Sequence, residues 1–323
     1  MGLPPKSIIR AGRWTWHRLW QVMMSQMAPR DAQGAYQRPK SEFLNSLPPD
    51  SPPQPGQYRL IVGWGCPWAH RTLVVRALKG LETSIPLDLV HPAPAEGGWV
   101  FANGTGPLRS LYQRVAPGYQ GRATVPVLWD SAQNKIINNE SAEILVILNE
   151  QFNHLAAVPD LDLYPEGLRS EIDTWNQKIY TTVNNGVYQC GFAQTQHAYT
   201  AACQSLFATL DHIEGVLGHQ RFLCGSDLTL ADVRLFTTLI RFDAVYYALF
   251  KCNLRRIRDY LHLSGYLRDL YQLPGVKETC HLDAIKQDYY GNLFPLNPSG
   301  IIPLGPHLDD LEANPQREHL SAR

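Results

Sequence analysis

The sequence has no excess of charge of either sign, because 29 Lys and Arg residues are matched by 29 Asp and Glu residues. A chain without a field of one sign does not concentrate polyanions at its surface. No apolar run approaches the roughly 18 residues of a membrane-spanning helix. The basic residues near the N-terminus precede a mixed stretch rather than the apolar core of a secretory signal. Neither a nucleic acid nor a membrane is therefore expected as a partner.

Cysteine pairs at the C-x-x-C spacing are also absent, and the histidines show no ligand-like spacing to acids or cysteines. No metal site is expected, and a chain of 323 residues needs no disulfide staples. The segment 103–106 contains two glycines, but it lacks the Lys of a phosphate-binding loop and precedes no convincing helical pattern. A reducing, cytoplasmic setting is the simplest interpretation of the six cysteines.

The length favours two domains with an extension at each end. Residues 1–57 end in a Pro-rich segment at 47–55, which cannot sustain a helix or a central strand. We expect an irregular N-terminal arm with one short helix at residues 14–24. Residues 286–323 are again rich in proline, and an extended tail over the surface is expected there.

Residues 58–153 have the pattern of a small mixed sheet with helices on its faces. A strand-like run at 58–62 is followed by a helical stretch at 67–79 and by a second strand at 84–90. The insertion that follows is unusually long, which suggests a functional role. The remaining expected elements are strands at 124–129 and 135–137 and a helix at 140–152.

Residues 165–285 change to an apolar period of 3.6, which is typical of packed helices. Within this segment, Thr229 precedes a helical pattern and Asp232 follows three residues later. This pair is a variant of the capping box that begins a helix. The second domain is therefore predicted to be entirely helical.

Cys66 lies between the first strand and the first helix of the mixed domain, directly before Pro67. Proline is favoured at the first helical position, which makes Cys66 the N-cap residue. Free backbone N–H groups and the helix dipole should favour the thiolate there, and His70, Arg71 and Arg76 add cations to the same helix. The alternative is a small turn residue, but the placement favours a nucleophile.

A second thiol is missing from this motif, because Ala69 occupies the position three residues after Cys66. Without a resolving cysteine, Cys66 would form a mixed disulfide with an external thiol. A second external thiol would then resolve it.

Several longer motifs follow one another along the chain. They are Gly63-Trp64-Gly65-Cys66-Pro67-Trp68-Ala69-His70-Arg71, Gly97-Gly98-Trp99, Arg122-Ala123-Thr124-Val125-Pro126-Val127-Leu128-Trp129-Asp130, Asn138-Asn139-Glu140-Ser141-Ala142-Glu143-Ile144, Asn184-Asn185-Gly186-Val187-Tyr188 and Gly191-Phe192-Ala193. In order and spacing, this series resembles the xi class of glutathione transferases, the S-glutathionyl-hydroquinone reductases. The resemblance implies an N-terminal thioredoxin-like domain, an all-helical C-terminal domain and a homodimer.

The resemblance makes Cys66 the catalytic nucleophile and Trp99 the ring that packs on glutathione. Pro126 would be the cis proline of the thioredoxin-like fold. The backbone groups of Val125 would then be free to bind glutathione, which is peptide-like.

Glu140 and Ser141 begin a helix, whose free N–H groups can receive the γ-glutamyl carboxylate of glutathione while Glu140 receives its ammonium group. Simple helix capping is the alternative role for this pair. The resemblance places Arg122, Ala123 and Thr124 at the glutathione site as well, and the alternative for Arg122 is a solvated charge.

The resemblance also gives roles to three tyrosines. Tyr188 corresponds to the proton donor for the leaving hydroquinone, while Tyr246 and Tyr289 correspond to residues that lower the thiol pKa by hydrogen bonding to the thiolate. Each of the latter has a neighbouring alternative, Tyr247 or Tyr290.

The expected activity is the glutathione-dependent reduction of S-glutathionyl-hydroquinones through a Cys66–glutathione mixed disulfide. Glutathione, as co-substrate, and glutathionylated aromatic molecules are the expected partners, with no metal. The same cysteine chemistry fits an omega-like thioltransferase or dehydroascorbate reductase, and a non-catalytic binding scaffold is a third alternative. The segment 291–301 lacks the Ser-His pair expected in the family, which leaves the substrate contacts of the tail in doubt.

Overall fold

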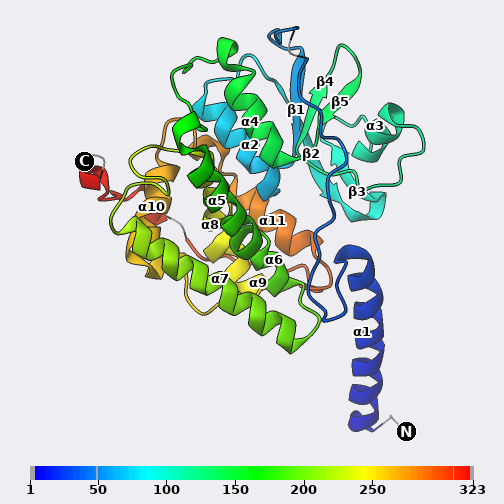
Figure 1. Ribbon diagram of the computed structural model, residues 1–323. Helices are drawn as coiled ribbons and strands as arrows, with labels where there is room; N and C mark the ends of the chain where they lie inside the picture. Colours follow the sequence, from blue (N-terminus) through cyan, green and yellow to red (C-terminus); the bar gives the residue numbers. More distant parts are fainter. Residues whose placement is uncertain (1–3, 49, 308, 321–323) are drawn as a thin grey trace.

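A computed structural model describes residues 4–48, 50–307 and 309–320. Figure 1 shows a sheet with flanking helices, a larger helical body beside it, and one long helix that projects from the rest. The strands are β1 Tyr58–Val62, β2 Leu87–Ala93, β3 Gly98–Phe101, β4 Val127–Asp130 and β5 Lys135–Asn138. The helices are α1 Pro5–Met27, α2 Pro67–Leu78, α3 Leu108–Val115, α4 Ser141–Glu150, α5 Arg169–Ile179, α6 Gly186–Gly191, α7 Gln196–Leu217, α8 Leu230–Arg241, α9 Tyr247–Leu249, α10 Leu261–Tyr271 and α11 Leu282–Asn292.

The sheet has the strand order β3-β2-β1-β4-β5. β1 pairs in parallel with β2 and antiparallel with β4, so Leu60 has Leu87 on one side and Leu128 on the other. This central strand is apolar along most of its length because it is covered on both faces, and Leu60 and Val62 are fully buried. α2 and α4 pack against each other beside it (Figure 1). The predicted mixed sheet with flanking helices is confirmed.

Three expectations for this domain are wrong in detail. The strand expected at 124–129 begins only at Val127, after the cis peptide bond before Pro126. The second strand begins at Leu87 rather than at residue 84, because Ser84 lies in a turn where its carbonyl accepts a hydrogen bond from the N–H of Gly56. The long insertion contains β3 and α3, and α3 begins directly after the glycine-containing segment 103–106, where no helix was expected. α3 has only eight residues, too few for a helical period to be recognised in the sequence.

The predicted helical domain is confirmed, and two of its helices are interrupted. π-helical segments follow α5 at Tyr180–Asn184 and α8 at Phe242–Tyr246. Such insertions are rare and are frequent at functional sites. The capping box at the start of α8 is present as predicted, with Thr229 N–H donating to the Asp232 carboxylate over 2.9 Å.

Both ends of the chain differ from expectation. α1 is 23 residues long instead of a short helix at residues 14–24. The arm after it lies along the sheet edge, where Asn45 N–H donates to the Ile137 carbonyl and Asn139 N–H donates to the Phe43 carbonyl. At the other end, α11 continues to Asn292, so the extended tail begins later than residue 286.

Candidate active site

Cys66 is the N-cap residue of α2, and its carbonyl accepts the first helical hydrogen bond from the N–H of His70 over 3.0 Å. The Cys66 thiol donates to the carbonyl of Val125 over 3.5 Å. Val125 precedes Pro126 through a cis peptide bond, as expected. The β1–α2 turn and the segment before β4 therefore meet at the sulfur.

The turn that carries Cys66 is held by the helical domain. The guanidinium of Arg241, at the end of α8, donates to the carbonyls of Trp64 and Gly65 over 3.3 Å each. The carboxylate of Asp288, in α11, accepts the N–H of Gly65 over 3.1 Å. A Cβ at residue 65 would collide with the Asp288 side chain, so this clasp requires glycine. We refer to Gly65, Arg241 and Asp288 as the turn clasp.

Burial raises the pKa of the Cys66 thiol. The backbone N–H groups of Ala69 and Trp68 and the positive charges of Arg38 and Arg241 act in the opposite direction. The helix N-terminus thus favours the thiolate as expected, but the loss of water on burial outweighs it.

The cations expected to help the thiolate lie elsewhere. His70 bonds to Arg241 and to Thr279, and burial with the charge of Arg241 holds its pKa well below its usual value, so His70 is neutral. Arg71 donates to Ser141 over 3.2 Å and to Asn184 over 2.5 Å. Both side chains serve the contact between the domains.

Three tyrosine hydroxyls from three different helical segments meet near Cys66. The hydroxyl oxygen of Tyr289 lies 2.5 Å from that of Tyr188 and 3.0 Å from that of Tyr246. Burial raises the pKa of all three, and the charge of a Cys66 thiolate raises those of Tyr188 and Tyr246 further. The phenols therefore remain protonated and able to donate hydrogen bonds.

The neighbouring tyrosines face other surroundings. Tyr290 donates to the carbonyl of Ala244 over 3.2 Å, and Tyr247 is only partly buried outside this cluster. The π-helical turn that ends at Tyr246 brings this residue, rather than the next one, to the site. The first member of each pair is the one beside Tyr188.

The other predicted binding residues lie on the sheet or directly before one of its strands. The Trp99 ring lies against Gly63, three residues before Cys66, where a Cβ would collide with it. The carbonyl of Thr124 accepts the hydroxyl of Tyr112, and Ala123 packs against the core. Arg122 is exposed, and its carbonyl accepts the hydroxyl of Tyr119.

Glu140 caps α4, and its carboxylate accepts the N–H of Ala142 over 3.1 Å and the hydroxyl of Ser41 over 2.9 Å. The Ser141 hydroxyl accepts a hydrogen bond from Arg71. The capping role considered from the sequence is thus present, and the arm residue Ser41 already engages the same carboxylate.

Arg38, also on the arm, was not foreseen. Its guanidinium lies 3.8 Å from the centre of the Trp68 ring and lowers the pKa of Cys66, which burial raises. No carboxylate among the described residues pairs with it. The sequence offers no local signal, because Arg38 reaches Cys66 from a segment without regular structure.

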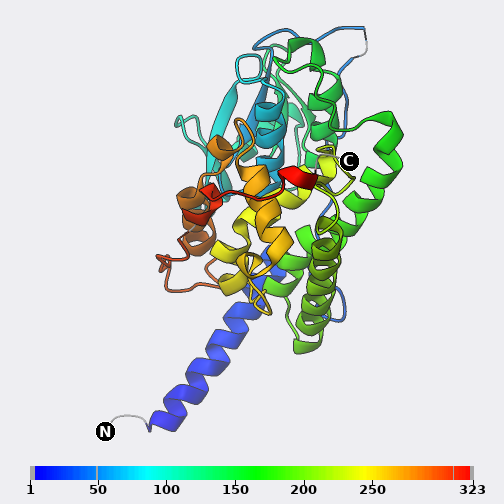
Figure 2. The same ribbon diagram turned by 90° about the vertical axis from the view of Figure 1, so that its left-hand side faces the viewer.

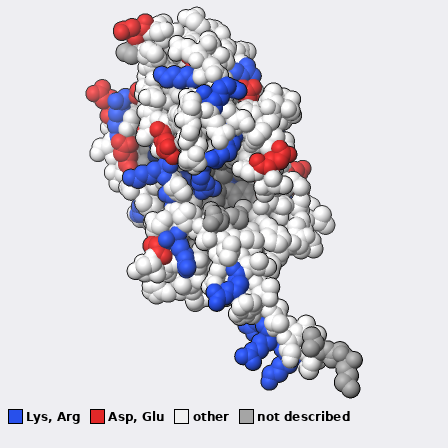
Figure 3. Space-filling model, turned by 90° about the vertical axis from the view of Figure 1, so that its right-hand side faces the viewer, with Lys and Arg blue, Asp and Glu red and all other residues white. Residues whose placement is uncertain are grey.

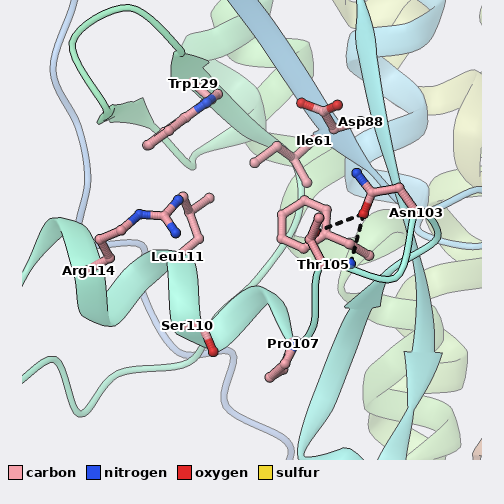
Figure 4. A pocket seen from close by; sticks show the side chains of 10 residues that line it. Ile61, Asp88, Asn103, Thr105, Pro107, Ser110, Leu111, Arg114 and Trp129 are labelled. Carbon is pink, nitrogen blue, oxygen red and sulfur yellow. Dashed lines mark hydrogen bonds between the residues drawn. The ribbon is translucent and has the colours of Figure 1, made fainter.

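A separate pocket of about 260 Å³ lies between the sheet and α3 (Figure 4). Two of its polar side chains are already engaged: Asn103 accepts the N–H and hydroxyl of Thr105, and Asp88 pairs with Arg59. None of its ten lining residues is a cysteine or tyrosine, so the chemistry resides at Cys66 instead.

Models of known protein families match a segment of each domain. Residues 65–151 match the glutathione S-transferase N-terminal domain, and residues 196–269 match the C-terminal domain. Among curated proteins, the glutathionyl-hydroquinone reductase YqjG of Escherichia coli is 44% identical over 315 residues, covering 91% of this chain and 94% of its own. PcpF of Sphingobium chlorophenolicum, also a glutathionyl-hydroquinone reductase, is 45% identical over 84% of this chain and 90% of its own.

Comparison with solved structures points to the same family. The xi glutathione transferase of Phanerochaete chrysosporium superposes with a TM-score of 0.83 at 46% identity, covering 86% of this chain and 95% of its own. Glutathione-bound YqjG superposes with a TM-score of 0.80 at 42% identity, covering 88% and 97% of the two chains.

Proposed function

The chain belongs to the xi class of glutathione transferases, and we propose that its site at Cys66 reduces S-glutathionyl-hydroquinones to hydroquinones with glutathione. The observation that carries this proposal is the placement of one helix-capping thiol beside three hydrogen-bonded phenols, with no second cysteine in the motif. A thiol without a resolving partner suits a substrate that brings its own sulfur.

In the first step, the Cys66 thiolate attacks the glutathione sulfur of the substrate. The sulfur–sulfur bond of a mixed disulfide forms as the carbon–sulfur bond to the aromatic ring breaks. Tyr188 gives its proton to the ring carbon, so the hydroquinone leaves neutral. Tyr289 donates to the oxygen of Tyr188 as that oxygen becomes negative, and Tyr246 supports Tyr289.

In the second step, another glutathione returns a proton to the Tyr188 oxygen from its thiol. Its thiolate attacks the sulfur of the mixed disulfide that is bound in the glutathione site. Oxidised glutathione leaves, and the Cys66 thiolate is restored. The raised pKa of the buried thiol makes Cys66 a good nucleophile once ionised, and Arg38 and Arg241 favour that ionised form.

The glutathione portion would bind along the sheet side of the site. The backbone groups of Val125, beside the Cys66 thiol, suit its peptide-like centre, and the start of α4 at Glu140 and Ser141 suits its γ-glutamyl end. Trp99 would cover it from the insertion. Arg122 would reach a carboxylate of glutathione from the surface.

We also propose a homodimer in the cytoplasm, on the basis of the family resemblance. The described cysteines are all free thiols, which suits a reducing compartment. Sedimentation of the full chain would give its assembly state.

The test is glutathione-dependent release of hydroquinone from a synthetic glutathionyl-hydroquinone. Cys66→Ser should abolish turnover, while Cys190→Ser, a buried thiol in α6, should keep it. If wild type forms a glutathione mixed disulfide by intact mass but releases no hydroquinone, the activity is that of a general thioltransferase. Absence of both would leave a binding scaffold.

A further inference from the structure

α1 projects from the body for most of its length, and the same view turned by 90° shows the helix clear of other elements (Figures 1 and 2). Only its last part is anchored, where Met24 is fully buried and Trp20 packs against the core. Trp16 contacts Phe294 of the tail edge to face. The first three turns therefore meet solvent on all sides.

The projecting part has two different faces. At 3.6 residues per turn, Ile8, Ile9, Trp16 and Leu19 lie on one face, and each exposes about half of its surface. An apolar stripe of this kind is normally covered by a partner. The tail beside Trp16 adds three further exposed apolar residues, Phe294, Ile301 and Leu304.

The opposite face carries the basic residues, with the exposed ring of Trp14 between Arg10 and Arg18. Lys6, Arg10, Arg13 and Arg18 belong to α1, and the first acidic residue of the chain is Asp31. Figure 3 shows Lys and Arg but no Asp or Glu on the projecting helix. The chain as a whole is neutral, so positive charge is concentrated at this end and the remainder is net negative.

We propose that the apolar face of α1 lies in the interface of a membrane that carries anionic lipid headgroups. Apolar and tryptophan side chains on one face and basic residues on the other are the composition of a helix that binds in the plane of a bilayer. The net positive charge of the helix is attracted to an anionic surface, whereas the net negative charge of the remainder of the chain is repelled by that surface.

This proposal revises the expectation of no membrane partner, which considered only spanning segments. Among the described residues, no helix is long and apolar enough to cross a bilayer. The amphipathic pattern of α1 instead suits a helix that rests on one side of it. The Cys66 site lies in the body, on α2, and no residue of α1 belongs to it.

The test uses flotation of the full chain with vesicles of phosphatidylcholine containing about 30% phosphatidylglycerol, and with phosphatidylcholine alone. Wild type should float with the anionic vesicles at low salt and be released at high salt. Ile9→Asp, and Arg10→Glu combined with Arg13→Glu, should each reduce the bound fraction at least about tenfold. The matched controls are Leu254→Asp, an equally exposed apolar residue, and Lys135→Glu on β5.

Circular dichroism and turnover of the variants should equal wild type, since these side chains lie far from the core. Binding of wild type to neither vesicle, or equally to both, would overturn the proposal. A change in the sedimentation of Ile9→Asp, with no vesicle binding by wild type, would assign the face to a second copy of the chain and would equally overturn it.

Discussion

Arg38 is a cation whose charge acts on the thiol, and no carboxylate in the described part of the chain forms an ion pair with it. Because its charge lowers the pKa of Cys66, Arg38→Gln should raise that pKa and leave less thiolate at neutral pH. We expect alkylation of Cys66 by iodoacetamide at pH 7 to slow by up to about tenfold, with the midpoint of the rate–pH curve moved upward. Lys40→Gln, an exposed residue on the same arm, is the control. Equal midpoints for the two variants would contradict this role.

Tyr289 bridges the hydroxyls of Tyr188 and Tyr246. Tyr289→Phe removes both hydrogen bonds while keeping the ring, so the Tyr188 oxygen loses the donor that stabilises it after proton transfer. We expect the rate of hydroquinone release to fall about 10- to 100-fold. Tyr290→Phe should retain the wild-type rate, and a similar loss in both variants would indicate a packing effect instead.

The sequence located Cys66 and Tyr188 because they belong to long motifs, whereas Tyr246 and Tyr289 came from the family correspondence alone, each with a neighbouring tyrosine as an alternative. It could not locate Arg38, Arg241 or Asp288, since each reaches Cys66 or the turn that carries it from a distant segment, and the local pattern of that segment is that of an ordinary loop or helix. The reverse error also occurred: the cation His70 is close to Cys66 in sequence, but its side chain points into the domain contact and is neutral.

The capping box of α8 is buried, unlike the N-cap of α7 at Thr195. The Thr229 hydroxyl donates to Asp232 over 2.8 Å, so Thr229→Val leaves a buried carboxylate with one partner fewer. We expect a loss of about 1–2 kcal/mol in the free energy of unfolding. Urea titration should give a smaller loss of unfolding free energy for Thr195→Val, at the exposed N-cap. Equal losses in the two variants would show that burial of the Asp232 carboxylate adds nothing to the effect of Thr229→Val.

The elements with a strong apolar period or a helix-capping residue could be predicted from the sequence, and β1, α2, α4 and α8 are examples. The length of α1 was underestimated because Pro4, Pro5 and Gly12 are poor helix formers, although the apolar spacing of the helix continues through them. α3 was missed because eight residues give too few repeats of a period. The π-helical turns have no sequence signature, yet one of them decides which tyrosine faces the site.

Asp288 joins the two domains, and burial raises its pKa to about 6. A carboxyl whose folded-state pKa lies above its unfolded value of 3.8 favours the folded state below pH 4, and this contribution is lost as the pH rises to about 6. Asp288→Asn does not titrate. Its unfolding temperature relative to wild type should therefore rise between pH 4 and 6 and stay constant above that range. Asp283→Asn, at an exposed position of α11, is the control. A difference that is flat across this range would show that Asp288 does not titrate there.

Because of the turn clasp, the N-terminal domain cannot form the active site without the helical domain. A fragment cut after residue 153 would keep Cys66, Trp99 and Glu140, and by composition it would pass for a minimal redox module. It would nonetheless lack both groups that fix the geometry of Gly65, and all three phenols. Grafting the thiol motif onto another thioredoxin-like scaffold would transfer a cysteine but not its proton donor. The activity can therefore be transferred only with the whole two-domain chain.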